Sequence, residues 1–127
     1  MRDLLGVDER MLTGISHINI RVKDMKKAVA FYTSQLGMKL IVNDPIIDHY
    51  EVAAQGSEGP GICPCEDSKM VGEHTGIIFS TKDIQSTCQM LRKNGVKVTE
   101  PYKAHGEWWA GFKDLDGNSF GIHEVQV

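Results

Sequence analysis

Two cysteines that lie two residues apart form the closest pair of reactive thiols in the sequence, Cys63-Pro64-Cys65. Thiolates are zinc ligands, and paired thiols carry out redox chemistry, so the pair could serve either purpose. A structural zinc site needs four ligands, and the third cysteine of the chain, Cys88, does not supply a second pair. We therefore interpret Cys63 and Cys65 as structural thiols. Cys88 falls at an apolar position of a predicted helix, which indicates a small buried hydrophobe.

Two further groups could bind charged partners. Residues 114–118 (DLDGN) resemble the start of a calcium-binding loop, but the later Glu and the flanking helices of such a loop are missing. An Asp-Gly pair is a strong signal for a tight turn, so we predict a hairpin here. Arg21 could anchor an anion through its guanidinium group or reach into solvent, and the sequence leaves both alternatives open.

Two adjacent tryptophans, Trp108 and Trp109, lie in a segment that is apolar throughout. Neighbouring residues of a strand face opposite sides, so we expect one tryptophan to face a cavity and the other to face the core or a partner. Aromatic side chains in a cavity bind flat organic ligands, while packing in the core is the alternative. The sequence has no glycine-rich phosphate loop, and its spacing predicts no Ser-His-Asp or Cys-His arrangement.

The whole chain has the composition of one ordinary globular domain. It has 127 residues, of which 41% are apolar and 24% are charged, and its net charge is −3. This charge gives no basic surface for nucleic acid, and no apolar run approaches the roughly 20 residues that cross a membrane. The N-terminal residues lack the apolar segment of a secretion signal, and three cysteines cannot all pair, so we expect a cytoplasmic protein.

The stretch that begins at His17 is repeated, in outline, from Gly76. HINIRVKDMKKAVAFYTSQLG and GIIFSTKDIQSTCQMLRKNG each have the pattern of a strand, a Lys-Asp pair, a helix and a glycine. Such a repeat indicates two copies of one supersecondary unit inside a single domain. Asp24 and Asp83 lie at the helix N-cap position, where a side-chain oxygen can accept the first free backbone N–H groups.

Each copy predicts the order β-α-β-β-β. Pro64 indicates that the fourth strand of the first copy lies at a sheet edge or is irregular. A right-handed crossover makes the strands on either side of the helix parallel, and the first and fourth strands of each copy are then parallel as well. We expect strands over 15–22, 38–42, 48–53, 61–65, 75–81, 96–99, 108–113 and 119–125, and helices over 25–36 and 84–94.

With this order, and with HINIRVKDMKKAVAFYTSQLGMKL and FKDLDGNSFGI near its two ends, the chain resembles the vicinal oxygen chelate superfamily. That superfamily includes glyoxalase I, bleomycin-resistance proteins and extradiol dioxygenases. The resemblance implies an α+β fold in which two β-α-β-β-β modules, about 14–68 and 73–127, form a curved mixed sheet with a concave ligand cavity. It also implies a homodimer. Residues 1–13 form an N-terminal extension, which either packs as a short helix or frays.

Enzymes of this superfamily hold a divalent metal through His and Glu side chains from the first and fourth strand of each module. His17 matches the first of these positions, but Gly76 and Gly121 occupy two others, and Glu66 is the only carboxylate near the fourth. Glycine has no side chain to bind an ion, and it leaves room for part of an organic ligand. We therefore expect no metal site, with His17, Glu66 and His74 as weak candidates.

Two histidines near these glycines do not restore the metal site. His74 and His123 are displaced in opposite directions along strands that we predict to be parallel. The two displacements add up to an offset of about four residues, which at about 3.3 Å per residue separates His74 from His123 by roughly 13 Å along the strands. Zinc–nitrogen bonds are about 2.0–2.1 Å long, so one ion cannot join both.

Alternation along the strands predicts which side chains face the cavity. The polar residues of the first strand lie opposite its apolar residues, which we expect to pack under the helix, and the repeat carries this assignment to the second module. We predict a ligand site formed by His17, Asn19, Arg21, Gly76, Ile78, Ser80, Gly121, His123 and one of Trp108 and Trp109.

Two functions are compatible with these features. The first is the binding of a small organic ligand without a metal, as in bleomycin-resistance proteins. The alternative is a divalent-metal-dependent lyase or isomerase of the glyoxalase kind, with His17 as one ligand and the others elsewhere. In both cases we expect a small-molecule partner and a second copy of the chain, with no nucleic acid and no membrane partner.

Overall fold

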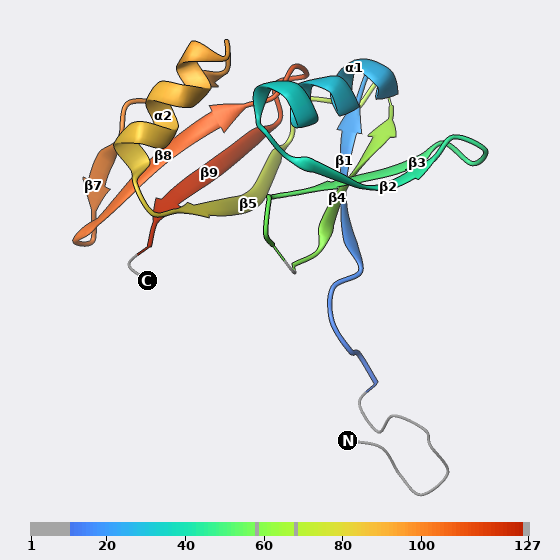
Figure 1. Cartoon of the computed structure of the whole chain (residues 1–127), viewed down its shortest axis with the longest axis horizontal. Helices are drawn as coiled ribbons and strands as arrows, with labels where there is room; N and C mark the ends of the chain where they lie inside the picture. The colour runs from blue at the N-terminus through green and yellow to red at the C-terminus, as the bar shows by residue number, and fades with distance from the viewer. Residues whose placement is uncertain (1–10, 58, 68, 126–127) are drawn as a thin grey trace, which may run out of the picture.

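The structure is a computed structural model that describes residues 11–57, 59–67 and 69–125 (Figure 1). The α+β class and the two β-α-β-β-β modules are confirmed. Module one consists of β1 (His17–Val22), α1 (Met25–Ala30), the π-helical turn η1 (Phe31–Gln35), β2 (Lys39–Asp44), β3 (His49–Ala53) and β4 (Gly61–Glu66). Module two consists of β5 (His74–Thr81), α2 (Ile84–Lys93), β6 (Lys97–Val98), β7 (Tyr102–Ala104), β8 (Glu107–Lys113) and β9 (Ser119–Glu124).

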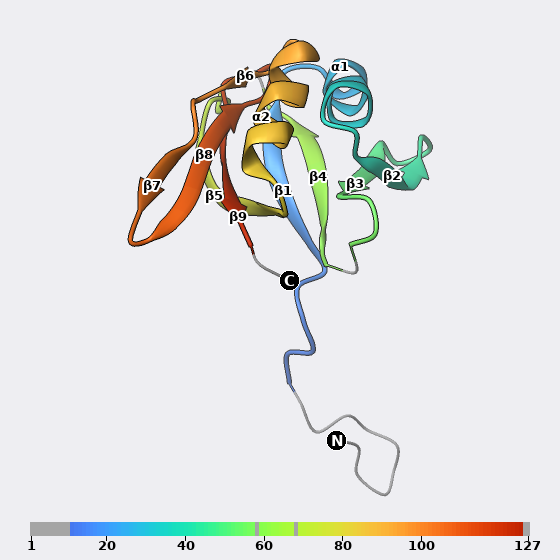
Figure 2. The same ribbon diagram turned by 60° about the vertical axis from the view of Figure 1, so that its left-hand side comes forward.

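The strands are hydrogen-bonded in two sheets, one for each module (Figure 2). The strand order is β1-β4-β3-β2 in the first sheet and β5-β9-β8-β6 in the second, where β7 also pairs with β8. The pairs β1–β4 and β5–β9 are parallel, as the crossover argument predicted. No strand pair joins the two sheets in the described part of the chain. Side chains, and not a shared ladder, therefore hold the modules together.

The structure decides between the two alternatives predicted for the fourth strand, an edge strand or an irregular segment. β4 is not an edge strand, because it lies between β1 and β3. Its pairing with β3 covers only Val52 and Ile62, so the two strands have already separated where Pro64 lies. A proline, which has no backbone N–H to donate, is tolerated at such an irregular position inside a sheet.

The sequence analysis missed β7 because it is only three residues long. β7 pairs with β8 across a tight turn at His105 and Gly106. Both turn residues have positive φ values, 52° and 77°, which is the conformation of the tightest hairpin turns.

The first helix also differs from its predicted extent. Regular α-helix ends at Ala30, and the chain continues through η1, in which the N–H of Leu36 donates to the carbonyl of Phe31. The hydroxyl of Thr33 donates to the carbonyl of Val29 at 2.8 Å. Such bonds back to the preceding turn bend helices, and wide π turns of this kind are local insertions in an α-helix.

Both predicted N-caps are confirmed. Asp24 Oδ1 accepts the backbone N–H of Lys27 at 3.0 Å, and Asp83 Oδ1 accepts that of Ser86 at 3.1 Å. The backbone N–H and the hydroxyl of Ser86 both donate to Asp83 and hold its pKa below the usual value, since they stabilise the charged carboxylate.

One apolar core runs through both modules. Tyr32 of η1 is fully buried and its ring lies edge-on to Phe120 of β9, with 6.1 Å between the ring centroids. Cys88 is buried in α2, as predicted. The described core consists of Ile20, Val22, Ala28, Phe31, Tyr32, Met38, Val52, Ile62, Ile84, Cys88, Leu91, Val96, Ala110, Phe112, Phe120 and Ile122.

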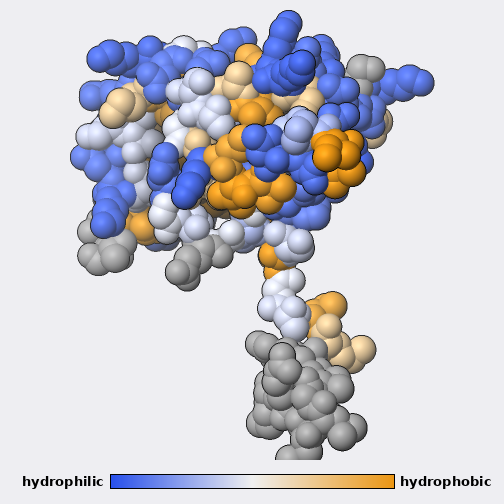
Figure 3. Space-filling view, turned by 45° about the vertical axis from the view of Figure 1, so that its right-hand side comes forward, coloured by the Kyte–Doolittle hydropathy of each residue, from blue (hydrophilic) through white to orange (hydrophobic). Residues whose placement is uncertain are grey.

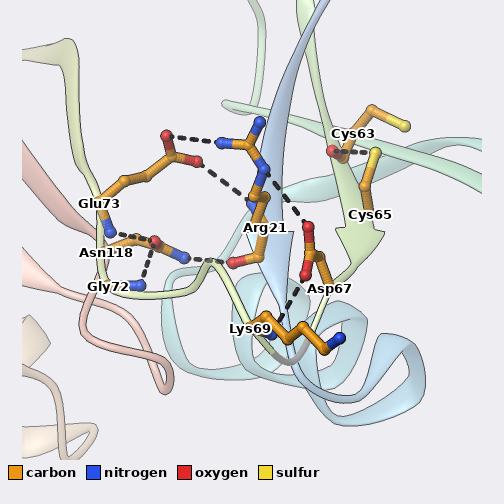
Figure 4. Close-up of polar contacts among 8 residues, drawn as sticks. All are labelled: Arg21, Cys63, Cys65, Asp67, Lys69, Gly72, Glu73 and Asn118. Carbon is orange, nitrogen blue, oxygen red and sulfur yellow. Dashed lines mark hydrogen bonds and ion pairs between the residues drawn. The ribbon is translucent and has the colours of Figure 1, made fainter.

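A buried polar group joins the modules where β1 ends and β9 begins (Figure 4). The side chain of Asn118 is completely buried, and its amide oxygen accepts the N–H groups of Gly72 and Glu73 at 3.0 and 2.9 Å. Its amide nitrogen donates to the carbonyl of Arg21 at 2.8 Å and to Asp114 Oδ2 at 2.9 Å. One side chain thus binds the end of β1, the segment before β5 and the β8–β9 turn. We call these contacts the Asn118 junction.

Asp114 completes this junction. Its Oδ2 accepts the hydroxyl of Tyr32 at 2.6 Å, and its Oδ1 accepts the N–H groups of Asp116 and Asn118, both at 2.9 Å. Donors from the protein therefore surround the carboxylate that would begin a calcium loop. The predicted hairpin turn is confirmed over residues 114–118.

The N-terminal extension is described only in part. Met11 and Leu12 are almost fully exposed, with 96% and 91% of their surface accessible. Residues 1–10, on which most of the predicted packing depends, lie outside the described residues. No helix in the described part of the chain is both long enough and apolar enough to cross a membrane.

Candidate functional site

The predicted site residues of module two lie on neighbouring strands of one sheet face. Strand pairing sets Ile78 beside Gly121 and Ser80 beside His123, and it sets His123 beside Trp109. The opposite face of this sheet carries buried residues such as Phe120 and Ile122, so the alternation agrees with the prediction. We call the set Gly76, Ile78, Ser80, Trp109, Gly121 and His123 the module-two face.

An aromatic stack of Trp109 and His123 lies on this face. The rings of Trp109 and His123 are nearly parallel, at 14°, with 4.1 Å between their centroids. The Trp109 indole N–H donates to the carbonyl of Ala104 at 3.1 Å, and His123 Nε2 lies 2.9 Å from Glu107 Oε1. Each ring is therefore held by a polar contact as well as by stacking. The pair offers a preformed flat surface.

Trp108 does not belong to this face. It alternates with Trp109 along β8 and stands on the opposite side of the sheet, where the Lys103 ammonium lies 6.0 Å from the centroid of its ring. The prediction that one of the two tryptophans contributes to the site therefore points to Trp109, and Trp108 is removed from the candidate residues.

Positions 76 and 121 of the module-two face are occupied by glycine for two different structural reasons. Gly76 has a φ of +72°, at an irregularity in the β5–β9 register between His74 and Ile78. Only glycine adopts this conformation without strain. At Gly121, a Cβ atom would lie 3.1 Å from Cγ1 of Ile78. The Ile78 side chain thus occupies space that we expected to be free for a ligand at Gly121.

A second polar cluster lies on module one, around His17. The Glu51 carboxylate of β3 lies 2.6 Å from His49 Nε2 and 3.9 Å from His17 Nδ1. The two imidazole rings meet edge to face, with 5.5 Å between centroids. Gly61 makes this possible, because a Cβ atom there would lie 2.7 Å from Glu51 Oε1.

Sequence reasoning missed His49 and Glu51. Their spacing of two residues in a predicted strand was a usable signal, since it places both side chains on one face. What the sequence did not reveal is that β3 lies close enough to β1 for Glu51 to reach His17. Asn19, the next predicted residue on β1, is exposed.

Arg21 is not a free anion anchor. Its guanidinium group lies 3.4 Å from Glu73 Oε2 and 3.7 Å from Asp67 Oδ2, and Glu73 Oε1 also accepts its backbone N–H (Figure 4). Two carboxylates already face this cation. Arg21 therefore ties the end of β1 to the segment between the modules, and its assignment as a ligand-binding residue stays a prediction.

The weak metal candidates have other partners. Glu66 Oε1 accepts the N–H of Met25 at 2.9 Å and so holds the start of α1. Glu124 does the same for Ile84 at the start of α2, also at 2.9 Å. His74 Nδ1 lies 2.8 Å from the hydroxyl of Ser119.

The side chains do not fit the divalent metal that the superfamily's enzymes use. Of the positions compared, Gly76 and Gly121 offer no donor atom, and the space beside Gly121 is filled by Ile78. In the described residues, no three His, Cys, Asp or Glu side chains are grouped so that they could hold an ion. Chemistry at these faces must therefore be argued from the protein's own groups.

A cleft of about 760 Å³ separates part of β5 from module one. Gly76, Ile78 and Ser80 line it together with Ile18 and Ile62. The loop between β3 and β4 closes another side. The predicted site is thus divided among the cleft, the His17 cluster and the Trp109–His123 stack.

Three comparisons place this geometry among known proteins. A lactoylglutathione lyase of Salmonella typhimurium is 27% identical over an alignment 126 positions long, which covers 87% of this chain and 91% of that protein. The crystal structure of a glyoxalase/bleomycin resistance protein/dioxygenase superfamily member from Sphaerobacter thermophilus is 28% identical. It has a TM-score of 0.81 and covers 91% of this chain and 100% of that chain.

The fold is also shared with TnmS3, an antibiotic binding protein from Streptomyces sp. CB03234. Its structure has a TM-score of 0.82 at 24% identity and covers 93% of this chain and 100% of that chain. The family model of the Glyoxalase/Bleomycin resistance protein/Dioxygenase superfamily matches residues 14–122. These residues include every helix of both modules and all strands but the last two residues of β9, so the chain belongs to this superfamily.

Proposed function

We propose that the protein binds a small, flat organic ligand on the module-two face, without a metal ion at the positions that the superfamily's enzymes use. The observation that carries this proposal is the Trp109–His123 stack, which lies beside the exposed Ile78 side chain. Ligand sites combine apolar and aromatic surface with a few polar groups that fix orientation. Here Ser80 and the Glu107–His123 pair supply such groups.

The module-one residues His17 and Asn19 remain part of this proposal as the opposing wall of the site. We expect them to be contributed across a homodimer, since a single chain leaves both faces open. Ile78 is 58% exposed, and Ile41 of β2 is 46% exposed beside Glu51 and Gly61. Apolar side chains also gather on the surface that Figure 3 turns toward the viewer. A second copy would remove such surface from water.

The adjacent tryptophans provide the matched pair for the experiment. A panel of antibiotics and metabolites is first screened for compounds that raise the midpoint of thermal unfolding, because a ligand that binds only the folded state must stabilise it. Affinity for each compound found is then measured in Trp108→Phe and Trp109→Phe. We expect Trp109→Phe and His123→Ala to weaken binding at least tenfold, and Trp108→Phe to leave it unchanged. Equal affinity in all three variants would place the ligand elsewhere.

A second candidate is a metal-dependent lyase of the glyoxalase kind. The similarity to a lactoylglutathione lyase of Salmonella typhimurium favours it. The assay is conversion of the hemithioacetal of methylglyoxal and glutathione, with added nickel or zinc. Turnover that His17→Ala abolishes would support the lyase and would contradict the proposed metal-free binding.

A further inference from the structure

The separation of β3 from β4 opens a slot beside the first turn of α1. Its volume is about 540 Å³. His49 and Tyr50 line it from β3, Cys63 and Cys65 from β4, and Lys26 from α1. The slot exists because the two strands pair only at Val52 and Ile62. A small molecule could therefore reach a thiol that is otherwise inside the sheet.

Hydrogen bonding fixes the protonation of the His49 ring. An ionised carboxylate can only accept, so the short 2.6 Å contact to Glu51 Oε2 places the ring proton on Nε2. In the neutral ring Nδ1 is then the unprotonated nitrogen, and it faces Cys63 Sγ, 3.8 Å away. The thiol S–H can donate to this nitrogen. Cys63, His49 and Glu51 thus have the relation of nucleophile, base and orienting carboxylate that activated nucleophiles share.

Burial keeps the Cys63 thiol in its neutral, protonated form. Cys63 is 4% exposed. Burial, and next the neighbouring Cys65 and Glu51, raise the pKa of its thiol to about 11. A preformed thiolate is therefore not the reacting species. The proton must move to His49 as the sulfur attacks, and Glu51 then stabilises the imidazolium ion that forms.

We propose that Cys63 is a nucleophile toward small neutral electrophiles in this slot, with His49 as its base and Glu51 as a positioning residue. With an α,β-unsaturated carbonyl compound, the sulfur forms a bond to the β carbon and the π electrons move to the enolate. The thiol proton passes to His49 Nδ1 and then to the α carbon, which leaves a thioether. No oxidant or reductant is required.

The charge around the slot selects the class of electrophile. Asp24, Asp48 and Glu66 line it with Lys26 as the one cation among the described lining residues. An anionic reagent is repelled by this excess of carboxylates and by Glu51. A neutral reagent meets no such barrier. This activity goes beyond the ligand binding proposed above, since it uses neither Trp109 nor His123.

Alkylation by iodoacetamide tests the proposal. The sulfur displaces iodide, which leaves with the C–I electron pair, while His49 takes the proton. The full chain carries Cys65→Ser, so that only Cys63 and the buried Cys88 remain. Mass spectrometry of peptides gives the rate at each thiol. We expect Cys63 to react faster than Cys88, and His49→Gln to slow Cys63 at least tenfold without slowing Cys88.

Three further measurements separate chemistry from folding. In His49→Gly, added imidazole should restore alkylation of Cys63 only. Glu51→Asp should retain more reactivity than Glu51→Gln, because only a carboxylate can accept from the imidazole. The rate of alkylation by the anionic iodoacetate, divided by the rate with neutral iodoacetamide, should be lower at Cys63 than at the thiol of glutathione. An unchanged Cys63 rate in folded His49→Gln, or no alkylation of Cys63 at all, would overturn the proposal.

Discussion

Replacement of Tyr32 by Phe should remove a specific part of the stability of the protein. The substitution keeps the ring that packs on Phe31 and Phe120 and deletes only the hydroxyl that donates to Asp114. Hydrogen bonds to charged groups contribute about 1.5–3 kcal/mol. Asp114 Oδ2 keeps its bond from Asn118, so the carboxylate is not left bare. We expect Tyr32→Phe to lower the free energy of unfolding by about 2 kcal/mol at pH 7.

The same contact predicts how the effect changes with pH. Burial, and next the negative charge of Asp114, raise the Tyr32 pKa far above its ordinary value. The tyrosine therefore stays protonated in the folded chain while it ionises in the unfolded chain. The hydroxyl's contribution to the free energy of unfolding is fully present below pH of about 10. Above that pH the contribution falls by about 1.4 kcal/mol per pH unit. Wild type and Tyr32→Phe should become equally stable near pH of about 11.5.

Urea unfolding followed by tryptophan fluorescence measures this difference at pH 7, 9, 10 and 11. The matched control is Tyr102→Phe, since Tyr102 is 54% exposed. That variant should follow the wild type at every pH. A Tyr32→Phe difference below about 0.5 kcal/mol at pH 7, where a bond to a charged group is worth several times more, would refute the role assigned to the hydroxyl. A difference that stays constant up to pH 11 would refute the pKa argument.

Three other outcomes follow from the structure. Asn118→Ala should destabilise the chain by about 3 kcal/mol in urea unfolding, because it removes four hydrogen bonds at about 0.5–1.5 kcal/mol each; a loss under 1 kcal/mol would mean that water replaces them. Light scattering at micromolar concentration should give about twice the 14.1 kDa of the chain, and a monomer mass would remove the dimer from the proposed function. Elemental analysis of protein purified without added metal should find less than one equivalent of zinc, nickel, iron and manganese together; a full equivalent that His17→Ala removes would reverse our assignment of the glycine positions.

The parts of the fold that repeat locally were predictable. The Lys-Asp pairs mark both helix starts, and alternation in His17–Val22 separates the exposed from the buried face. The parallel first and fourth strands follow from chain direction alone. These features depend on residues close in sequence or on general rules of topology, so one sequence is enough to derive them.

The composition of the candidate site was less predictable, because it depends on contacts between distant segments. The pairing of Arg21 with Glu73 joins residues 52 positions apart, and nothing local signals it. Which of Trp108 and Trp109 lies on the module-two face depends on how β8 pairs with β9. The sequence allows two interpretations of Gly76, as missing volume or as a backbone requirement. Its positive φ value establishes the backbone requirement, and a Cβ atom there would meet nothing within 4 Å, so the space beside it is open as well.

The absence of a shared ladder between the described sheets has a consequence for how this protein can diverge. Two sheets joined by backbone bonds can change their relative position only by whole steps of register. Here the angle between the modules depends on side chains, both of the shared core and of the Asn118 junction, which lies on neither open face. A substitution at the junction can tilt one module against the other and leave every strand intact. The width of the space between the faces is thus an adjustable dimension, set independently of the residues that would touch a ligand.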